Sequence, residues 1–317
     1  RRSSDLMYCK HCYRDAGDQA EHELNTTEGK ALINEIAKAG FKIMIFSGGE
    51  PLMRSDIYEL VEYASKLGLR PVLGSNGALI TKEVAQKLKA AGTMGIGISL
   101  DSLNPKKHDE FRGYEGGWRE AVKGMKNCRD AGIPFQIHTT VMKWNMCEML
   151  DITDFAVGMG AVAHHTFFLV PTGRGSDIEK QSLNPEQYEG LLTDIMLKQK
   201  EVSIELKPTC APEFMRIAKK MGMNPRFSRG CLAGTSYCII SPIGDVQPCA
   251  YLNIPIGNVR KTPFSEIWSS NPIFQELRTL DYKGKCGICK YKKACGGCRA
   301  RVAYYNDGDY MAGEDLC

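Results

Sequence analysis

The sequence lacks long apolar runs and any strong excess of one charge. Its 41 Lys and Arg residues face 37 Asp and Glu, which gives a net charge of +4 over 317 residues, whereas dedicated nucleic-acid binders carry strongly basic faces. No run approaches the roughly 18 apolar residues of a membrane span, and no signal peptide opens the sequence. We therefore expect neither nucleic acid nor a membrane as partner, and a cytoplasmic location.

Cysteine, by contrast, is abundant. The chain has 13 cysteines, and nine of them lie after residue 200. An odd number, repeated C-x-x-C pairs and the lack of a secretion signal disfavour a disulfide framework. The pattern favours metal or cluster ligation in a reducing compartment.

Helix-period and strand-like segments alternate between about residues 28 and 206. Strands are predicted at 41–46, 71–74, 95–100, 134–141, 163–169 and 203–206, and helices at 28–39, 56–67, 81–91, 117–131, 148–158, 186–200 and 211–221. Such alternation predicts a mostly parallel sheet covered by helices, either doubly wound or curved into a barrel.

Loops of unusual composition follow four of these strands, at 47–51, 74–77, 99–101 and 171–174. Because the carboxyl ends of parallel strands share one edge, ligand groups gather there. We therefore expect the four loops to form one site.

The character of the chain changes after about residue 225. Helical periodicity fades, Gly, Pro and Cys become frequent, and hairpin-like pieces appear at 237–241 and 246–251. We expect such a stretch to bury little apolar surface and to be held by something other than a core. The predicted domains are residues 1–225 and 226–317.

The C-terminal cysteines form the strongest motif. Cys286, Cys289, Cys295 and Cys298 lie within 13 residues and can converge on one metal centre or divide between two. By spacing alone, zinc is an equal alternative to an iron–sulfur cluster. Four more cysteines complete a set of eight, enough for two fully ligated centres: Cys231, Cys238, Cys249 and Cys317.

Of the five remaining cysteines, three stand outside any C-x-x-C pair. Cys128 and Cys147 lie in helical patterns, and we interpret both as small buried hydrophobic residues. Cys210, within the string Lys207 to Pro212, is equally compatible with a structural and a functional role.

A further C-x-x-C pair, Cys9 and Cys12, lies near the start of the sequence, and Gly48-Gly49-Glu50-Pro51 follows the first predicted strand. Alone, the pair fits zinc or a redox couple. Glycines allow close backbone approach to a ligand, Glu50 offers an acceptor for an ammonium group, and Pro51 fixes the turn. Each motif alone is a weak signal, but the two motifs together are a specific one.

With these motifs the chain resembles the radical S-adenosylmethionine (SAM) superfamily. The matching residues are Cys9, His11, Cys12, 48–51, Asn76, Ser99, Asp101 and Arg174. The C-terminal cysteines resemble the SPASM extension of that family, which carries two auxiliary [4Fe-4S] clusters. The resemblance implies a partial (β/α)6 radical SAM barrel followed by a small cysteine-rich SPASM domain.

The resemblance also implies SAM and three [4Fe-4S] clusters as cofactors. The implied cluster ligands are Cys9 and Cys12 at the SAM-binding cluster, Cys231, Cys238, Cys249 and Cys298 at auxiliary cluster I, and Cys286, Cys289, Cys295 and Cys317 at auxiliary cluster II. The residues implied for SAM are Gly48, Gly49, Glu50 and Pro51 at the methionine amine, His11 facing the adenine, and Asn76, Ser99 and Asp101 at the ribose or carboxylate. Without the motif, turn and cap chemistry is the simpler interpretation of these polar loop residues.

Within the SPASM proteins, the strings 168–174, 207–212, 229–234, 246–249 and 295–301 resemble the heme synthase branch and its NirJ-like relatives. This resemblance implies an iron porphyrin substrate and an external electron donor such as flavodoxin or ferredoxin. It implies that two propionates of iron-coproporphyrin III become vinyl groups by oxidative decarboxylation, giving heme b. A 5′-deoxyadenosyl radical would remove a hydrogen from the propionate β-carbon, and an auxiliary cluster could accept the surplus electron.

Porphyrin carboxylates need basic anchors, because Arg binds carboxylates in a bidentate manner. The candidate anchors are Arg112, Arg174, Arg229 and Arg301, and His138, His164 or His165 could ligand heme iron. The alternative for each is a surface charge or a satisfied core histidine.

One cysteine of the superfamily pattern, C-x3-C-x2-C, is absent. The residue four before Cys9 is Asp5, or the vacancy falls at Ser3 if Arg1 and Arg2 are aligned with the Arg-rich start of this branch. Three interpretations are open: an Asp5 carboxylate ligand, an altered or shifted sequence in this loop, or a member that no longer cleaves SAM.

The alternatives in function are therefore related tetrapyrrole side-chain removal, peptide maturation by a SPASM enzyme, and iron–sulfur binding without SAM cleavage. A zinc ribbon on an α/β domain explains the C-terminal pairs but leaves residues 48–51 unexplained.

Overall fold

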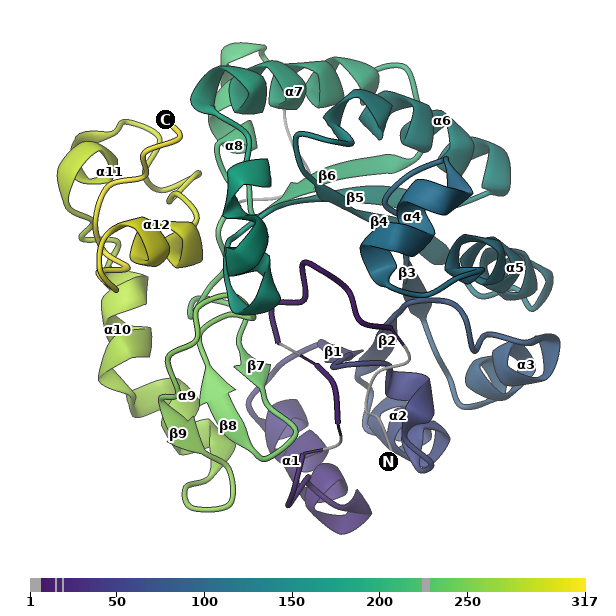
Figure 1. Ribbon diagram of the computed structural model, residues 1–317. Helices are drawn as coiled ribbons and strands as arrows, with labels where there is room; N and C mark the ends of the chain where they lie inside the picture. The colour runs from purple at the N-terminus through teal and green to yellow at the C-terminus, as the bar shows by residue number, and fades with distance from the viewer. Residues whose placement is uncertain (1–6, 15, 19, 224–228) are drawn as a thin grey trace.

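Parallel strands form the centre of the fold. The computed structural model describes residues 7–14, 16–18, 20–223 and 229–317. In these residues one sheet has six strands, ordered as in the sequence: β1 (Ile43–Phe46), β2 (Arg70–Ser75), β3 (Gly95–Ser99), β4 (Phe135–Val141), β5 (Ala163–Phe168) and β6 (Glu205–Thr209). All neighbouring pairs are parallel, and helices surround the curved sheet (Figure 1). The partial barrel is confirmed.

The helices predicted for the barrel all form, with ends shifted by a few residues. They are α1 (Thr26–Lys38), α2 (Ile57–Lys66), α3 (Lys82–Ala90), α5 (Gly117–Asp130), α6 (Met149–Met159), α7 (Pro185–Lys198) and α8 (Phe214–Lys220). Helix α1 begins with a capping box, in which Asn25 and Glu28 each accept a hydrogen bond from the backbone N–H of the other.

Helix α4 (Pro105–Arg112) was not predicted from the sequence. Asn104 caps it by accepting a hydrogen bond from the Lys107 N–H, and Pro105 occupies its first turn. The helix is short and mostly polar, so it carries almost no hydrophobic period. It nevertheless positions two buried residues of the site, His108 and Arg112.

Side chains alternate across each strand, so the sheet has two different faces. On β4 the residues Phe135, Ile137 and Val141 are fully buried and belong to the main core, whereas the intervening residues are half-buried. Each such aliphatic side chain contributes roughly 1.5–3 kcal/mol by burial. The other face, lined by residues such as His138, is the inner face of the barrel.

The C-terminal part contains a small antiparallel sheet and four short helices within the described residues. These elements are β7 (Ile239–Ile240), β8 (Asp245–Gln247), β9 (Gly257–Asn258), α9 (Phe264–Ser270), α10 (Pro272–Thr279), α11 (Gly284–Ile288) and α12 (Arg299–Tyr305). They lie to one side of the barrel, on the left in Figure 1. The predicted hairpin is confirmed by the antiparallel pairing of β7 and β8.

The expectation that this part buries little apolar surface was wrong. Phe264, Ile267 and Phe274 are buried in the same core as the sheet, and the Phe264 ring lies 5.7 Å from that of Phe41. Helices of five to eight residues are too short to display a clear period. The predicted domain boundary, between residues 225 and 226, falls within 224–228, outside the described residues, and stays a prediction.

Among the described residues, no helix combines the length and the apolar character that a bilayer crossing requires.

Candidate cluster and cofactor sites

The turn from Cys9 to Cys12 lies at the carboxyl edge of the sheet. The Cys12 N–H donates to the Cys9 carbonyl over 3.3 Å, and the Lys10 N–H donates to the Phe111 carbonyl at the end of α4. Arg174 holds the turn from the opposite side: its Nε donates to the Cys9 carbonyl at 2.9 Å, and its backbone N–H donates to the Cys12 carbonyl at 3.0 Å. Asp5 and Ser3 lie outside the described residues.

A buried ion pair lies beneath the Cys9 thiol. The Arg112 Nε donates to Asp101 Oδ2 at 2.6 Å, and its Nη1 lies 3.7 Å from Cys9 Sγ. Burial alone would raise the pKa of Asp101, but the Arg112 guanidinium outweighs it and lowers that pKa. Asp101 Oδ1 also accepts from the Thr140 N–H at 2.8 Å. The guanidinium therefore stays charged and favours the thiolate form of Cys9.

His11 is held neutral between aromatic rings. Its imidazole stacks on Phe111 with a centroid distance of 4.6 Å, and Phe111 contacts Trp144 at 5.3 Å. Burial, assisted by the Arg112 charge, lowers the pKa of His11 to about 3. Among the described residues, its buried Nδ1 has no hydrogen-bond partner. An unpaired buried ring nitrogen of this kind suits a ligand that brings a complementary hydrogen-bonding group.

Glu50 joins the loops after β1 and β2. Its carboxylate is 3% exposed and accepts from Ser75 Oγ at 3.0 Å, from the Asn76 N–H at 2.8 Å and from the Leu52 N–H at 3.2 Å. Gly48 has a φ of +142°, and a Cβ there would face open space. Pro51 begins the 3-10 helix η1 (Pro51–Met53).

These contacts bring the predicted loops to one edge of the sheet, as expected. The Asn76 side chain accepts from the Ala78 N–H at 2.9 Å and so has the turn role that was its alternative interpretation. Ser99 ends β3 and is half-buried. The specific contacts of Asn76, Ser99 and Asp101 with SAM stay predictions.

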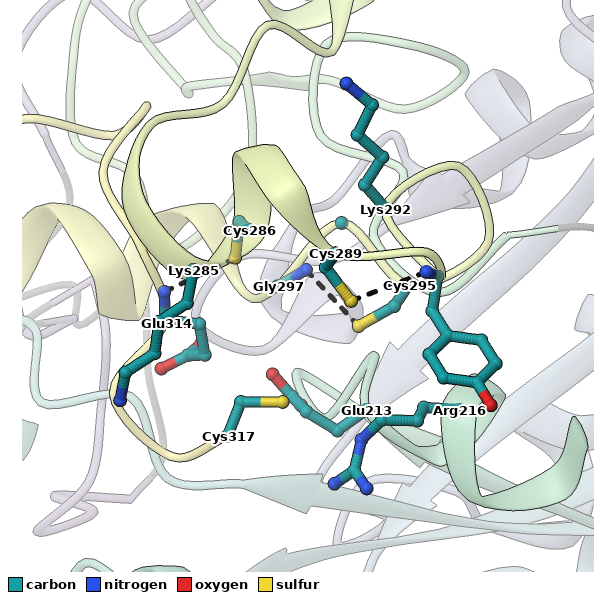
Figure 2. A pocket seen from close by; sticks show the side chains of 12 residues that line it. Glu213, Arg216, Lys285, Cys286, Cys289, Lys292, Cys295, Gly297, Glu314 and Cys317 are labelled. Atoms are coloured by element: carbon teal, nitrogen blue, oxygen red, sulfur yellow. Dashed lines mark hydrogen bonds between the residues drawn. The ribbon is translucent and has the colours of Figure 1, made fainter. Parts of the chain in front are cut away.

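The four cysteines assigned to auxiliary cluster II line one pocket, and Figure 2 shows their sulfur atoms around a common space: Cys286, Cys289, Cys295 and Cys317. Three of the sulfurs accept backbone N–H groups, from Glu314 at 3.3 Å, Tyr291 at 3.4 Å and Gly297 at 3.4 Å. Such donors stabilise thiolate charge and tune a cluster. The residues present therefore fit a cluster with four cysteine ligands.

The same pocket contains a buried carboxyl group. Burial, together with the nearby Glu314 carboxylate, raises the pKa of Glu213 to about 7. In the described part of the chain, no three His, Cys, Asp or Glu side chains converge as ligands of a single metal ion do.

Of the cysteines assigned to auxiliary cluster I, Cys231, Cys249 and Cys298 interact with one another electrostatically. The pKa of Cys298 is lowered to about 6, mainly by interaction with the Cys210 side chain. The Tyr251 N–H donates to Cys249 Sγ at 3.3 Å.

The remaining cysteines have different surroundings. Cys238 packs against the main core, and its charged neighbour is Arg278. Cys128 is buried, as predicted, but the burial predicted for Cys147 was wrong, because it lies exposed in the 3-10 helix η2 (Met146–Glu148).

Two histidines occupy the inner face of the sheet. The rings of His138 and His165 stack at 5.3 Å with an interplanar angle of 6°. Burial lowers the pKa of both, which favours the neutral imidazole. His165 Nε2 lies 3.2 Å from Glu205 Oε1. Gly97 leaves room for the His138 ring, since a Cβ at position 97 would lie 2.1 Å from its Cε1.

His164 faces the other side of the sheet. Its ring nitrogens lie 2.9 Å from Thr153 Oγ1 and 3.0 Å from Thr139 Oγ1. It is a satisfied core histidine, which was the alternative interpretation of the sequence.

Two further predicted anchors are tied to the cluster region. The Arg229 Nε donates to the Cys231 carbonyl at 2.8 Å. Arg301 is buried, with Nη2 at 3.1 Å from both Glu314 Oε2 and Tyr188 Oη.

Sequence reasoning missed Lys207. It pairs in register with His165 on the neighbouring strand, and burial lowers its pKa. The alternation of side chains along β6 could have indicated Lys207, because Glu205 and Lys207 lie on the same face of the sheet as His165.

Comparison with known proteins agrees with this geometry. A model of the radical SAM superfamily matches residues 6–156, and one of a SPASM iron–sulfur cluster-binding domain matches residues 231–299. The AdoMet-dependent heme synthase of Nitratidesulfovibrio vulgaris is 46% identical over 100% of this chain and 89% of its own length. The chain belongs to the radical SAM superfamily. As a SPASM member of this family it is a radical SAM enzyme, with SAM and a [4Fe-4S] cluster as cofactors and auxiliary clusters as a typical feature.

Two other similarities extend the comparison. The Fe-coproporphyrin III synthase of Methanosarcina barkeri is 32% identical over 98% of the chain described here and 84% of its own length. The crystal structure of Streptococcus suis SuiB bound to S-adenosylmethionine has a TM-score of 0.78, over 100% of this chain and 75% of that chain. At 18% identity, SuiB shows a likeness of fold.

Proposed function

We propose that the protein is a heme synthase, which converts two propionates of iron-coproporphyrin III to vinyl groups by oxidative decarboxylation and so forms heme b. The observation that carries this proposal is the 46% identity to a heme synthase along the whole chain. The iron porphyrin is the substrate, and flavodoxin or ferredoxin is the class of electron donor. The compartment is the cytoplasm.

The inner face of the sheet supports a flat, amphipathic substrate. At its β1 edge, Ile43 and Ile45 are 53% and 52% exposed. At the other side, His138, His165 and Lys207 bring imidazole and ammonium groups to the same face. A porphyrin ring is apolar and its propionates are anionic. The apolar β1 edge therefore matches the ring, and the side with the imidazole and ammonium groups matches the propionates. His138 or His165 would face the iron, and Lys207 a carboxylate.

The residues around Cys9 hold the SAM-binding cluster. When bound, the cluster and SAM supply the radical chemistry, and the protein supplies position and excludes water. Arg112 and Arg174, expected as substrate anchors, contact Cys9 directly, and we assign them to positioning this turn. Glu50 receives the methionine amine, and the free Nδ1 of His11 accepts a hydrogen bond from the adenine.

The three [4Fe-4S] clusters of the proposal can be counted. After anaerobic reconstitution, we expect about twelve irons per chain and cleavage of SAM to 5′-deoxyadenosine with dithionite. About eight irons without cleavage would contradict the enzyme. An Asp5→Cys variant completes the C-x3-C-x2-C motif. If this variant regains the missing irons and cleaves SAM, the missing cysteine at position 5 explains their loss in the wild type.

A second candidate, a tetrapyrrole side-chain reaction other than vinyl formation, is favoured by the 32% identity to Fe-coproporphyrin III synthase. Product analysis separates the two. Heme synthesis consumes iron-coproporphyrin III and releases CO2 with vinyl products. Active SAM cleavage that leaves iron-coproporphyrin III intact rejects it and favours the second candidate.

A further inference from the structure

Cys210 lies where the barrel meets the C-terminal part. It directly follows β6, whose residues Glu205 and Lys207 neighbour the inner-face histidines. Its φ is +58°, in the left-handed region that a residue with a Cβ rarely adopts. Such a backbone conformation is unfavourable and is kept where its surroundings enforce it.

The Cys210 side chain neighbours that of Cys298, and both pack together with Cys249 in one small cluster of side chains. Cys298 and Cys249 also interact with Cys231 and with each other. Three of these four thiols lie next to the hydrophobic cluster around Val170 and Leu252. The four side chains therefore form one group, drawn from four separate segments of the chain.

The backbone around Cys210 is fixed against the segments that carry the other thiols. A Cβ at Gly230 would lie 2.5 Å from Pro212 Cβ, so glycine is required for the 229–231 segment to approach the 210–212 loop. From the other side, the Arg301 Nη1 donates to the Cys210 carbonyl at 2.9 Å. Arg301 is in α12, which begins directly after Cys298. Both contacts hold the Cys210 thiol near Cys231 and Cys298.

Cys238 has no such placement. It packs against the main hydrophobic core, and its charged neighbour is the Arg278 guanidinium. Arg278 in turn stacks over the Trp268 ring at 4.4 Å and donates to the Gly234 carbonyl. The resemblance to SPASM proteins implied Cys238 as a ligand of auxiliary cluster I, beside Cys231, Cys249 and Cys298.

We propose that Cys210 is the fourth cysteine ligand of auxiliary cluster I, beside Cys231, Cys249 and Cys298, and that Cys238 is a structural residue. The proposal rests on the presence of that cluster, which belongs to the proposed function. Four thiolates complete the coordination of a [4Fe-4S] cluster. The cluster is thereby joined to the end of β6, close to the sheet face that we assign to the porphyrin.

Iron content and spectroscopy test this assignment without turnover. Cys210→Ala, Cys238→Ala and the exposed control Cys147→Ala are each reconstituted anaerobically as the full chain. Iron and sulfide are counted, and EPR spectra are recorded after dithionite reduction. We expect Cys210→Ala to lose one cluster, about four irons, or to show a three-iron signal. Cys238→Ala and Cys147→Ala retain the wild-type iron and spectrum.

Wild-type iron and an unchanged spectrum in Cys210→Ala overturn the proposal, and so does loss of a cluster from Cys238→Ala. If Cys210→Ala does not fold, Cys210→Ser is used. Its hydroxyl ligand should change the Mössbauer parameters of one iron site, and an unchanged Mössbauer spectrum overturns the proposal. None of these readouts requires heme formation. The ligand assignment can therefore be tested even if iron-coproporphyrin III proves not to be the substrate.

Discussion

At the scale of single residues, buried charges organise the turn that carries Cys9. Asp101 is fully buried, and it neutralises Arg112 while fixing the backbone of Thr140. The sequence placed Asp101 at a ligand-binding edge, but it could not show this pairing. The partner comes from α4, whose polar sequence hides it.

Asp101→Asn should therefore destabilise the protein by about 3–5 kcal/mol, because it removes the carboxylate that forms the buried ion pair with the Arg112 guanidinium. Urea titration of the holoprotein measures the effect, and iron content should fall with it. The matched control is Glu83→Gln, which breaks an exposed helical pair with Lys87. A stability loss no larger than that of the control would show that the pair contributes little.

A second residue-scale prediction concerns pH. Burial lowers the pKa of His164 to about 3 from the ordinary 6.5. Below pH 6.5 the unfolded chain binds a proton at His164 that the folded chain does not. The contribution of His164 to the free energy of unfolding is therefore complete above pH 6.5 and is lost as pH falls towards 3. One such group changes stability by about 1.4 kcal/mol per pH unit.

His164→Gln should accordingly flatten the dependence of unfolding free energy on pH between 6.5 and 5 by about one proton, or roughly 2 kcal/mol in total. The control variant is His22→Gln, at an exposed position. Equal slopes in wild type and His164→Gln would mean that His164 accepts a proton in the folded state.

At the scale of elements, β3 shapes the sheet face that we assign to the substrate. Its glycines remove side chains from that face, and Gly97 makes room for the His138 ring. A Cβ at the neighbouring Gly95 would be 3.5 Å from its nearest atom, which is an ordinary contact.

Gly97→Ala should therefore displace the His138 ring, cost about 1–3 kcal/mol and weaken iron-porphyrin binding at least tenfold. Titration of the Soret band measures the affinity, with Gly95→Ala as the matched control. Unchanged affinity in Gly97→Ala would remove His138 from the substrate site, whereas equal losses in both variants would point to general damage to the strand.

The elements also show which features could be read from the sequence. The barrel strands and their helices carry strong hydrophobic periods, and residues 286–298 carry clustered cysteines, so both were predictable. Helix α4 and helices α9 to α12 have too few turns for a clear period. The grouping of Cys210 with Cys298 joins segments 88 residues apart in the numbering, and no local pattern indicates it.

At the scale of the whole molecule, the carboxyl edge of the sheet, its inner face and the cysteine-lined C-terminal part belong to one arrangement. Arg174 ties the Cys9 turn to the loop after β5, and Arg301 ties α12 to the end of β6. The residues proposed for SAM and those proposed for the auxiliary clusters thus adjoin the strands on which the substrate is proposed to lie.

The central claim is hydrogen removal from a porphyrin propionate. The most direct test supplies iron-coproporphyrin III with deuterium at the propionate β-carbons, together with SAM and dithionite. The account predicts vinyl products, CO2 and deuterium in the 5′-deoxyadenosine. Unlabelled 5′-deoxyadenosine beside unchanged iron-coproporphyrin III would contradict it.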